Sequence, residues 1–143
     1  MRYHNERGSA LLEMALTLPL LLLICVGIFE FGRAYQTQQV LTNAAREGAR
    51  VAILSGQPDG AVQARVTAYA TAGQISNPDT AVASVAATQV SIGGGNTTSG
   101  SRVTVEYPYA FMVLQPVARL IVRTTTVGSA FTMRAVAEMR NEQ

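Results

Sequence analysis

The chain has 143 residues, a net charge of +2 at pH 7, and only 14% charged residues. The length fits a single domain. The nearly balanced charge, with no basic stripe between aromatic residues, gives no reason to expect nucleic acid as a partner. The only cysteine, Cys25, excludes an internal disulfide. Together with the only histidine, His4, it leaves almost no basis for a zinc site or a Cys–His nucleophile.

The first strong feature is an apolar run from Leu11 to Phe31, LLEMALTLPLLLLICVGIFEF. As a helix, these residues would span roughly 31 Å, which matches the ~30 Å hydrocarbon core of a bilayer. The run is longer than the apolar part of a secretory signal, and no small-x-small cleavage site follows it. We therefore predict a transmembrane helix, with Phe29, Phe31 and Tyr35 near its far interface, where aromatic rings are favoured.

Two residues distinguish this run from an ordinary signal anchor. Glu13 places a carboxylate inside the apolar run, which costs about 2.5–3.5 kcal/mol at the bilayer centre and less near the edge. Gly8 closes a short polar stretch, MRYHNERG, directly before the run. Taken alone, Glu13 is equally well interpreted as a side chain that reaches up to the lipid headgroups.

Gly8 followed by an apolar segment, with Glu13 five residues later, resembles the class III signal of type IV prepilins. The resemblance implies a leader of residues 1–8 that a prepilin peptidase removes by cleavage between Gly8 and Ser9 at the cytoplasmic side. It also implies that the apolar helix is retained and that Ser9 is often N-methylated. Glu13 would then pair with the new amino terminus of a neighbouring subunit, which removes most of the cost of burying the carboxylate.

A longer stretch, 8–52, resembles the TadE-like family of tight-adherence (Tad, Flp or type IVc) pili. The matching pieces are Glu13, Pro19, Gly27, Glu30-Phe31-Gly32-Arg33 and Ala45–Arg50, with weaker likeness at Val103–Tyr109 and Met139-Arg140. The resemblance implies a minor pseudopilin that acts in pilus biogenesis, adhesion and surface colonisation. The implied partners are the prepilin peptidase, other Tad pilins and pseudopilins, inner-membrane platform proteins and the lipid bilayer.

The predicted organisation has four parts: a leader at 1–8, a transmembrane segment at 9–32, the periplasmic half of the same helix at 33–55, and a small α+β periplasmic domain at 56–143. This makes a single-pass inner-membrane protein with a cytoplasmic leader, and leaves open whether it enters an extracellular pilus. Arg46 and Arg50 lie one turn apart on the periplasmic half. They are interpreted either as a solvated helix face or as a contact to another subunit, peptidoglycan or lipid phosphate.

The distal half changes from helical to alternating periodicity, which indicates strands. We predict a helix to about Thr71, a loop at 72–81, strands near 86–92, 102–111 and 131–139, a flexible loop at 93–100 and a short helix at 113–123. Pro108 argues for the edge or the end of its strand. Because the strands alternate rather than run unbroken, an antiparallel sheet is favoured. The predicted fold class is α+β, with a long N-terminal helix packed on a small antiparallel sheet and one or two short helices, as in pilins.

The sequence contains no phosphate-binding loop, no paired metal ligands and no nucleophile with an adjacent base. We therefore predict neither an enzyme nor a cofactor or metal site. The alternative to a pseudopilin is a signal-anchored, single-pass periplasmic binding module outside any filament. For such a module, Gly8 and Glu13 would be incidental.

Overall fold

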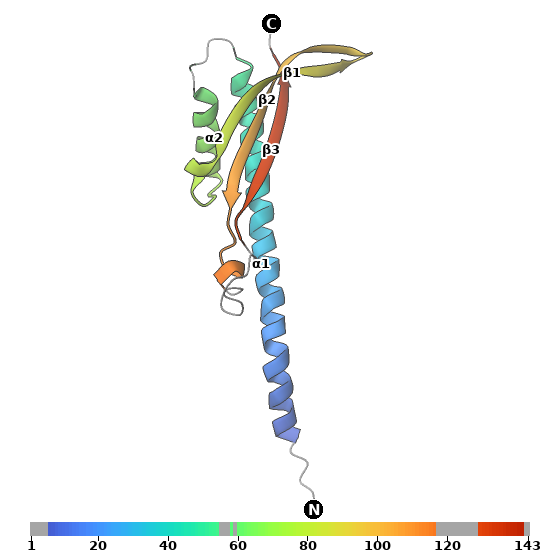
Figure 1. The fold of residues 1–143 in the computed structure, drawn as a ribbon, viewed down its shortest axis with the longest axis vertical. Coiled ribbons are helices and arrows are strands. Elements are labelled where there is room, and N and C mark those ends of the chain that lie inside the picture. The colour runs from blue at the N-terminus through green and yellow to red at the C-terminus, as the bar shows by residue number, and fades with distance from the viewer. Residues whose placement is uncertain (1–5, 55–57, 59, 117–128, 142–143) are drawn as a thin grey trace, which may run out of the picture. The chain divides into compact units, whose positions relative to one another are not determined.

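The computed structural model describes residues 6–54, 58, 60–116 and 129–141. Its elements, in chain order, are α1 (Glu6–Ala52), α2 (Ala61–Ala72), the 3-10 turn η1 (Pro78–Thr80), β1 (Val82–Gly93), β2 (Asn96–Tyr109) and β3 (Phe131–Arg140) (Figure 1). α1 continues through Pro19. A long helix packed on a three-stranded antiparallel sheet confirms the predicted α+β class.

The chain divides into two compact units. The first contains Met1–Arg33 and Phe111–Ser129, and the second contains Ala34–Ala110 and Ala130–Gln143. α1 supplies residues to both, its apolar half to the first and its alanine-rich half to the second.

The sheet of the second unit is an antiparallel meander in the order β1-β2-β3. Val82 of β1 lies opposite Glu106 of β2, and Tyr109 of β2 lies opposite Phe131 of β3. The alternation that predicts the last two strands is confirmed by burial. The buried apolar positions of these strands are Val103, Val105, Tyr107, Tyr109, Met133, Ala135 and Ala137.

The alanine-rich half of α1 completes this core. Leu41, Ala44, Ala45 and Ala49 are fully buried. Burying a side chain the size of Leu41 contributes about 1.5–3 kcal/mol. Gly48 lies where three elements approach closely: a Cβ there would be 2.9 Å from Cγ2 of Val66 in α2 and 3.3 Å from Cγ1 of Val103 in β2. The small residues of this helix half therefore set its distance from α2 and the sheet.

The second helix begins at Ala61 and ends at Ala72, close to its predicted end at Thr71. Its Val66 and Ala70, one turn apart, are buried. Gly73 follows directly, and a Cβ at this position would lie only 2.4 Å from Cγ1 of Val40. The close packing of α2 on α1 therefore needs glycine at its end.

The prediction of a flexible loop at 93–100 is wrong. β1 runs to Gly93 and β2 begins at Asn96, so Gly94 and Gly95 alone form the turn. Their φ angles are 62° and 80°, and a tight two-residue hairpin turn with positive φ at both central positions favours glycine. In the run GGGNTTSG, glycine suggests a loop, but the threonines fit a pleated strand.

Pro108 is the last residue but one of β2 and lies beyond the last pair between β1 and β2 at Glu106. Its predicted place at a strand end is confirmed. The predicted helix at 113–123 is represented by helical residues 114–116, while residues 117–128 lie outside the described part of the chain.

Candidate functional site

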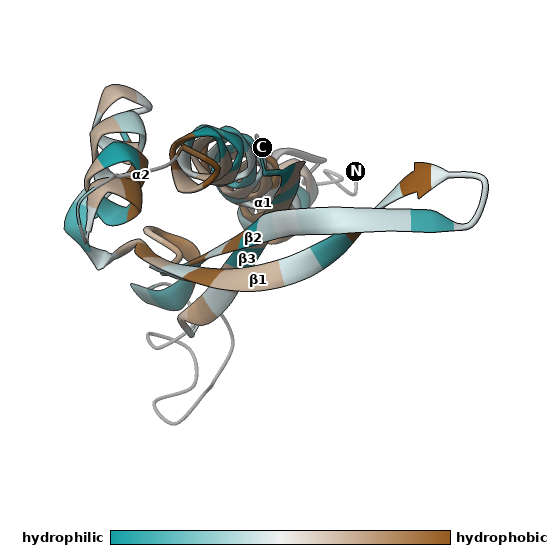
Figure 2. Cartoon of the chain, turned by 90° about the horizontal axis from the view of Figure 1, so that it is seen from above, coloured by the Kyte–Doolittle hydropathy of each residue, from teal (hydrophilic) through white to brown (hydrophobic). Residues whose placement is uncertain are grey.

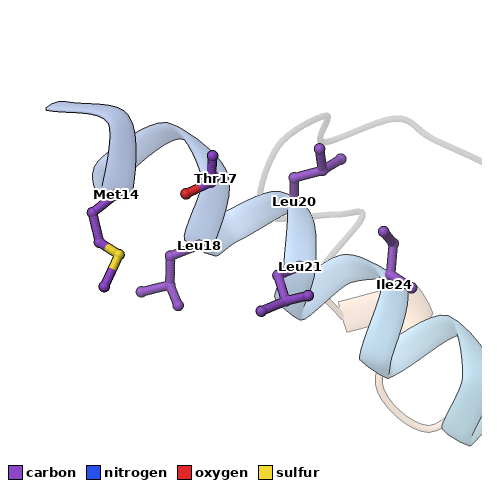
Figure 3. A pocket seen from close by; sticks show the side chains of 6 residues that line it. All are labelled: Met14, Thr17, Leu18, Leu20, Leu21 and Ile24. Atoms are coloured by element: carbon purple, nitrogen blue, oxygen red, sulfur yellow. The ribbon is translucent and has the colours of Figure 1, made fainter. Parts of the chain in front are cut away.

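The apolar half of α1 is exposed along its length. Its leucines, methionine and isoleucines between Leu11 and Ile28 are 48–72% exposed. Figure 3 shows five of these side chains together with Thr17, and the six line a hollow along the helix: Met14, Thr17, Leu18, Leu20, Leu21 and Ile24. Within the described residues, α1 is the one helix long and apolar enough to cross a membrane, and none of its most apolar 18-residue window is buried. A water-soluble protein rarely exposes so large an apolar surface, so this half fits a single-pass membrane anchor.

Gly8 and Ser9 lie in the first turn of α1, which begins at Glu6, and both are exposed. The peptide bond between them therefore lies close to the first described residue of the helix. This is the part of a helix that frays most readily, so little structure has to be lost before the bond becomes extended.

Glu13 lies about one and a half turns further along the same helix and is also exposed. Its backbone carbonyl accepts a hydrogen bond from Oγ1 of Thr17 at 2.9 Å. Within the described residues, its carboxylate forms no ion pair. The apolar run of α1 from Leu11 to Phe31 therefore presents one exposed charge, Glu13, on an otherwise apolar surface.

Arg46 and Arg50 belong to the second unit, and the structure does not bring them together with Gly8 or Glu13. Each has a partner one turn earlier: Nη1 of Arg46 donates to Oδ1 of Asn43 at 3.2 Å, and Arg50 lies 3.5 Å from Glu47. Glu47 also binds Arg65 of α2 at 3.0 Å. Both predicted arginines are exposed, so they remain accessible on a solvated face.

The structure reveals a polar centre that the sequence does not indicate. The carboxylate of Glu30 is 1% exposed. Its Oε1 accepts hydrogen bonds from the backbone N–H of Val113 and from that of Leu114, the latter at 3.4 Å. Because the helical residues begin at 114, the Glu30 carboxylate caps these two N–H groups as the side chain of an N-cap residue does.

Arg33 lies beside this cap, with its Nη1 4.0 Å from Oε2 of Glu30. An acid three residues before a base on a helix is visible in the sequence as a local pair. The partner that explains the burial of Glu30 is 83 residues away, and no local pattern connects the two. The missed signal was Glu30 itself, a second carboxylate at the end of an apolar run.

Among the described residues, no three His, Cys, Asp or Glu side chains lie close enough together to hold a metal ion. Cys25 is a free thiol on the exposed apolar half of α1. The apolar run of α1, from Leu11 to Phe31, therefore combines an exposed apolar surface with one exposed acid, Glu13, and one buried acid, Glu30.

Residues 8–50 match the family model described as TadE-like protein. This segment is TadE-like. The match confirms the resemblance where the sequence carries it most strongly, while the distal likeness at 103–109 and 139–140 lies outside the matched residues and stays a prediction. The TadE-like family is structural and associated with Tad pili. No curated protein and no solved structure matches the chain significantly.

The matched segment coincides with most of α1 and contains Gly8, Ser9, Glu13, Arg46 and Arg50. Every residue predicted for processing or contact thus lies within the TadE-like helix. The sheet, α2 and the segment that Glu30 caps lie outside the match.

Proposed function

We propose that this TadE-like chain is a minor pseudopilin, a structural or assembly subunit of a Tad pilus. One observation carries the proposal: Glu13 is a lone exposed carboxylate on a TadE-like apolar helix, none of whose most apolar window is buried within the chain. In lipid, such a charge is stable only with a partner. A partner from outside the chain is what assembly with another subunit would supply.

In this proposal, a prepilin peptidase cleaves between Gly8 and Ser9 at the cytoplasmic face of the inner membrane. The helix stays in the bilayer, and the second unit lies in the periplasm. The amine freed at Ser9 would meet Glu13 of a neighbouring pilin or pseudopilin. Pairing the two charges offsets most of the cost of keeping each in a low-dielectric environment.

Processing is tested by co-expressing the full chain with a prepilin peptidase and measuring the intact mass of the membrane-extracted protein. We expect the loss of residues 1–8 and a new amino terminus at Ser9. Gly8→Phe should block the shift, because a bulky side chain prevents the close approach of a protease to the backbone. A matched change, Gly27→Phe, lies far along the helix and should leave the shift intact. Recovery of uncleaved wild-type chain beside active peptidase would contradict the proposal.

Pairing is tested with Glu13→Ala and Glu13→Gln in cells that assemble the pilus. We expect normal membrane insertion with both variants, because removing a charge from an apolar helix lowers the insertion cost. Pilus assembly should be lost with both, since neither can pair with an amine. Unchanged assembly would instead favour a signal-anchored periplasmic binding module in which Glu13 is incidental.

A further inference from the structure

The two outer strands of the sheet differ in how their edges are protected. β3 carries Arg134, Glu138 and Arg140 on its exposed positions, and Nε2 of Gln38 in α1 donates to the backbone carbonyl of Arg134 at 3.1 Å. β1 has no charged residue and no proline in its 12 residues. Charged side chains, proline and covering elements are the means by which proteins keep edge strands from pairing with other chains.

The hydrogen bond between Ala83 and Gln63 defines which groups of β1 face outward. The backbone N–H of Ala83 donates to Oε1 of Gln63 in α2 at 2.7 Å, so it points away from β2. In an antiparallel pair, successive residues point alternately toward and away from the partner strand. The residues that share this outward orientation are Val85, Ala87, Gln89 and Ser91.

These four residues present a row of backbone donors and acceptors at the edge of the sheet. None of the hydrogen bonds recorded among the described residues uses their outward N–H or C=O groups. α2 bonds to the start of this edge through Gln63, and its first residues line a hollow that reaches Val85, without a hydrogen bond to Val85 among the described residues. A row of open groups at strand spacing is complementary to one kind of ligand, an extended backbone.

The far end of β1 is further isolated because it has left the three-stranded part of the sheet. β3 pairs with β2 only as far as Gly100, opposite Arg140. From Val90 to Thr98, the hairpin of β1 and β2 therefore consists of two strands, which Figure 2 shows as an arm extending from the sheet. A two-stranded ribbon is marginally stable in water, and a third strand would stabilise it.

We infer that the outer edge of β1, from Val85 to Ser91, binds an extended segment of a different polypeptide by β-strand addition. The segment should be uncharged, because the side chains of β1 are Ala, Val, Ser, Thr, Gln and Ile and offer no counter-charge. This inference uses the backbone of the second unit and does not depend on cleavage at Gly8 or on pairing of Glu13.

A second copy of the chain fits this edge poorly by antiparallel pairing of two β1 edges or by pairing of β1 with β3. Antiparallel pairing of two β1 edges relates the copies by a two-fold axis perpendicular to the sheet, which reverses the helix half Ala34–Ala52 that packs along that sheet. Two chains anchored at the same end in one membrane leave it in the same direction. Pairing with β3 of a second copy meets an edge where Gln38 already binds the carbonyl of Arg134.

The test is site-specific photocrosslinking of the full chain in its own cells. A benzophenone side chain is introduced at position 87 or 89 on β1, and at position 136 on the protected strand β3 as the matched control. We expect adducts with another polypeptide from β1 positions and at least tenfold less from position 136. Peptide mapping should place the linked residue in an uncharged, extended segment.

The contribution of the backbone is tested with Ala87→Pro in the chain that carries the benzophenone side chain at position 89. The proline removes an outward N–H that does not bond to β2. We expect at least a tenfold loss of adduct. A second variant, Gln89→Lys, is tested with the crosslinker at position 87. It keeps every backbone group but adds a charge, and we expect it to reduce the adduct severalfold. This variant keeps the test valid if the proline variant misfolds. Equal adducts from both edges, adducts only between copies of this chain, or adducts unaffected by both substitutions would overturn the inference.

Discussion

The two halves of α1 form one continuous helix but bury their residues in opposite ways. Up to Arg33, its large apolar side chains are exposed, and from Ala34 on, its small side chains are buried against α2 and the sheet. Leu21 is 58% exposed, whereas Leu41 is fully buried. Helical periodicity alone does not distinguish the two halves. The distinction lies in side-chain size: large residues on all sides suit lipid or another subunit, whereas a stripe of alanine and glycine lets protein elements approach closely.

The largest effect is expected from Leu41→Ala. Removing a fully buried leucine side chain leaves a cavity and costs about 2–5 kcal/mol. Urea unfolding of the full chain in detergent, followed by the protease resistance of the β-sheet region, measures the change. Leu21→Ala is the matched control, because the Leu21 side chain is exposed and its removal leaves no cavity. An equal loss of stability in both variants would show that the exposed half is packed as tightly as the buried half.

Gly48→Leu compares the buried and the exposed half of α1 by adding side-chain volume instead of removing it. A Cβ at this position already meets Val66, Val62 and Val103 at 2.9–3.3 Å, and overpacking of a core typically costs about 1–3 kcal/mol. Gly27→Leu is the control, since a Cβ there meets nothing within 4 Å. We expect Gly48→Leu to lower the unfolding midpoint of the second unit and Gly27→Leu to leave it unchanged. A neutral Gly48→Leu would mean that the helix is free to shift on the sheet.

Glu30 lies near the boundary between the two halves. Substituting it tests whether its buried carboxylate holds the segment at Val113 and Leu114 in place. Glu30→Ala removes the acceptor of two backbone N–H groups, a loss of about 1–2 kcal/mol. Hydrogen exchange of the amides of Val113 and Leu114 should accelerate roughly tenfold or more, because 1.4 kcal/mol corresponds to a factor of ten.

Glu30→Gln is the matched control for charge. Its amide oxygen can still accept a hydrogen bond, but the favourable interaction of a carboxylate with the helix N-terminus is lost. We expect exchange at Val113 and Leu114 to lie between that of wild type and Glu30→Ala. Unchanged exchange in both variants would show that the cap contributes nothing to holding this segment.

Local patterns were sufficient to predict most of the fold but little of the Glu30 site. The period-two alternation around Val103 to Tyr109 predicts a buried strand face because burial in a sheet is local to the strand. The hairpin was missed because a two-residue turn at Gly94 and Gly95 and a flexible loop share the same composition. Glu30 was missed as a cap because its partners at Val113 and Leu114 are brought to it only by the tertiary fold. The strand order, and with it the unprotected edge of β1, is likewise a property of the assembled sheet.

The smallest effect on stability is expected from Arg50→Ala. A change in pilus assembly in this variant would therefore report on a contact of Arg50 and not on misfolding. The side chain of Arg50 is 68% exposed and pairs with Glu47 on the helix surface, so its loss should change the free energy of unfolding by less than about 0.5 kcal/mol. If the arginine contacts another subunit, peptidoglycan or lipid phosphate, pilus assembly should fall while the unfolding midpoint stays constant. Arg65→Ala, which removes a partner of the same glutamate from α2, controls for loss of the ion pair alone. Because both variants leave the core intact, a defect confined to Arg50→Ala would place the contact on the outward face of α1, and normal assembly with both would identify that face as merely solvated.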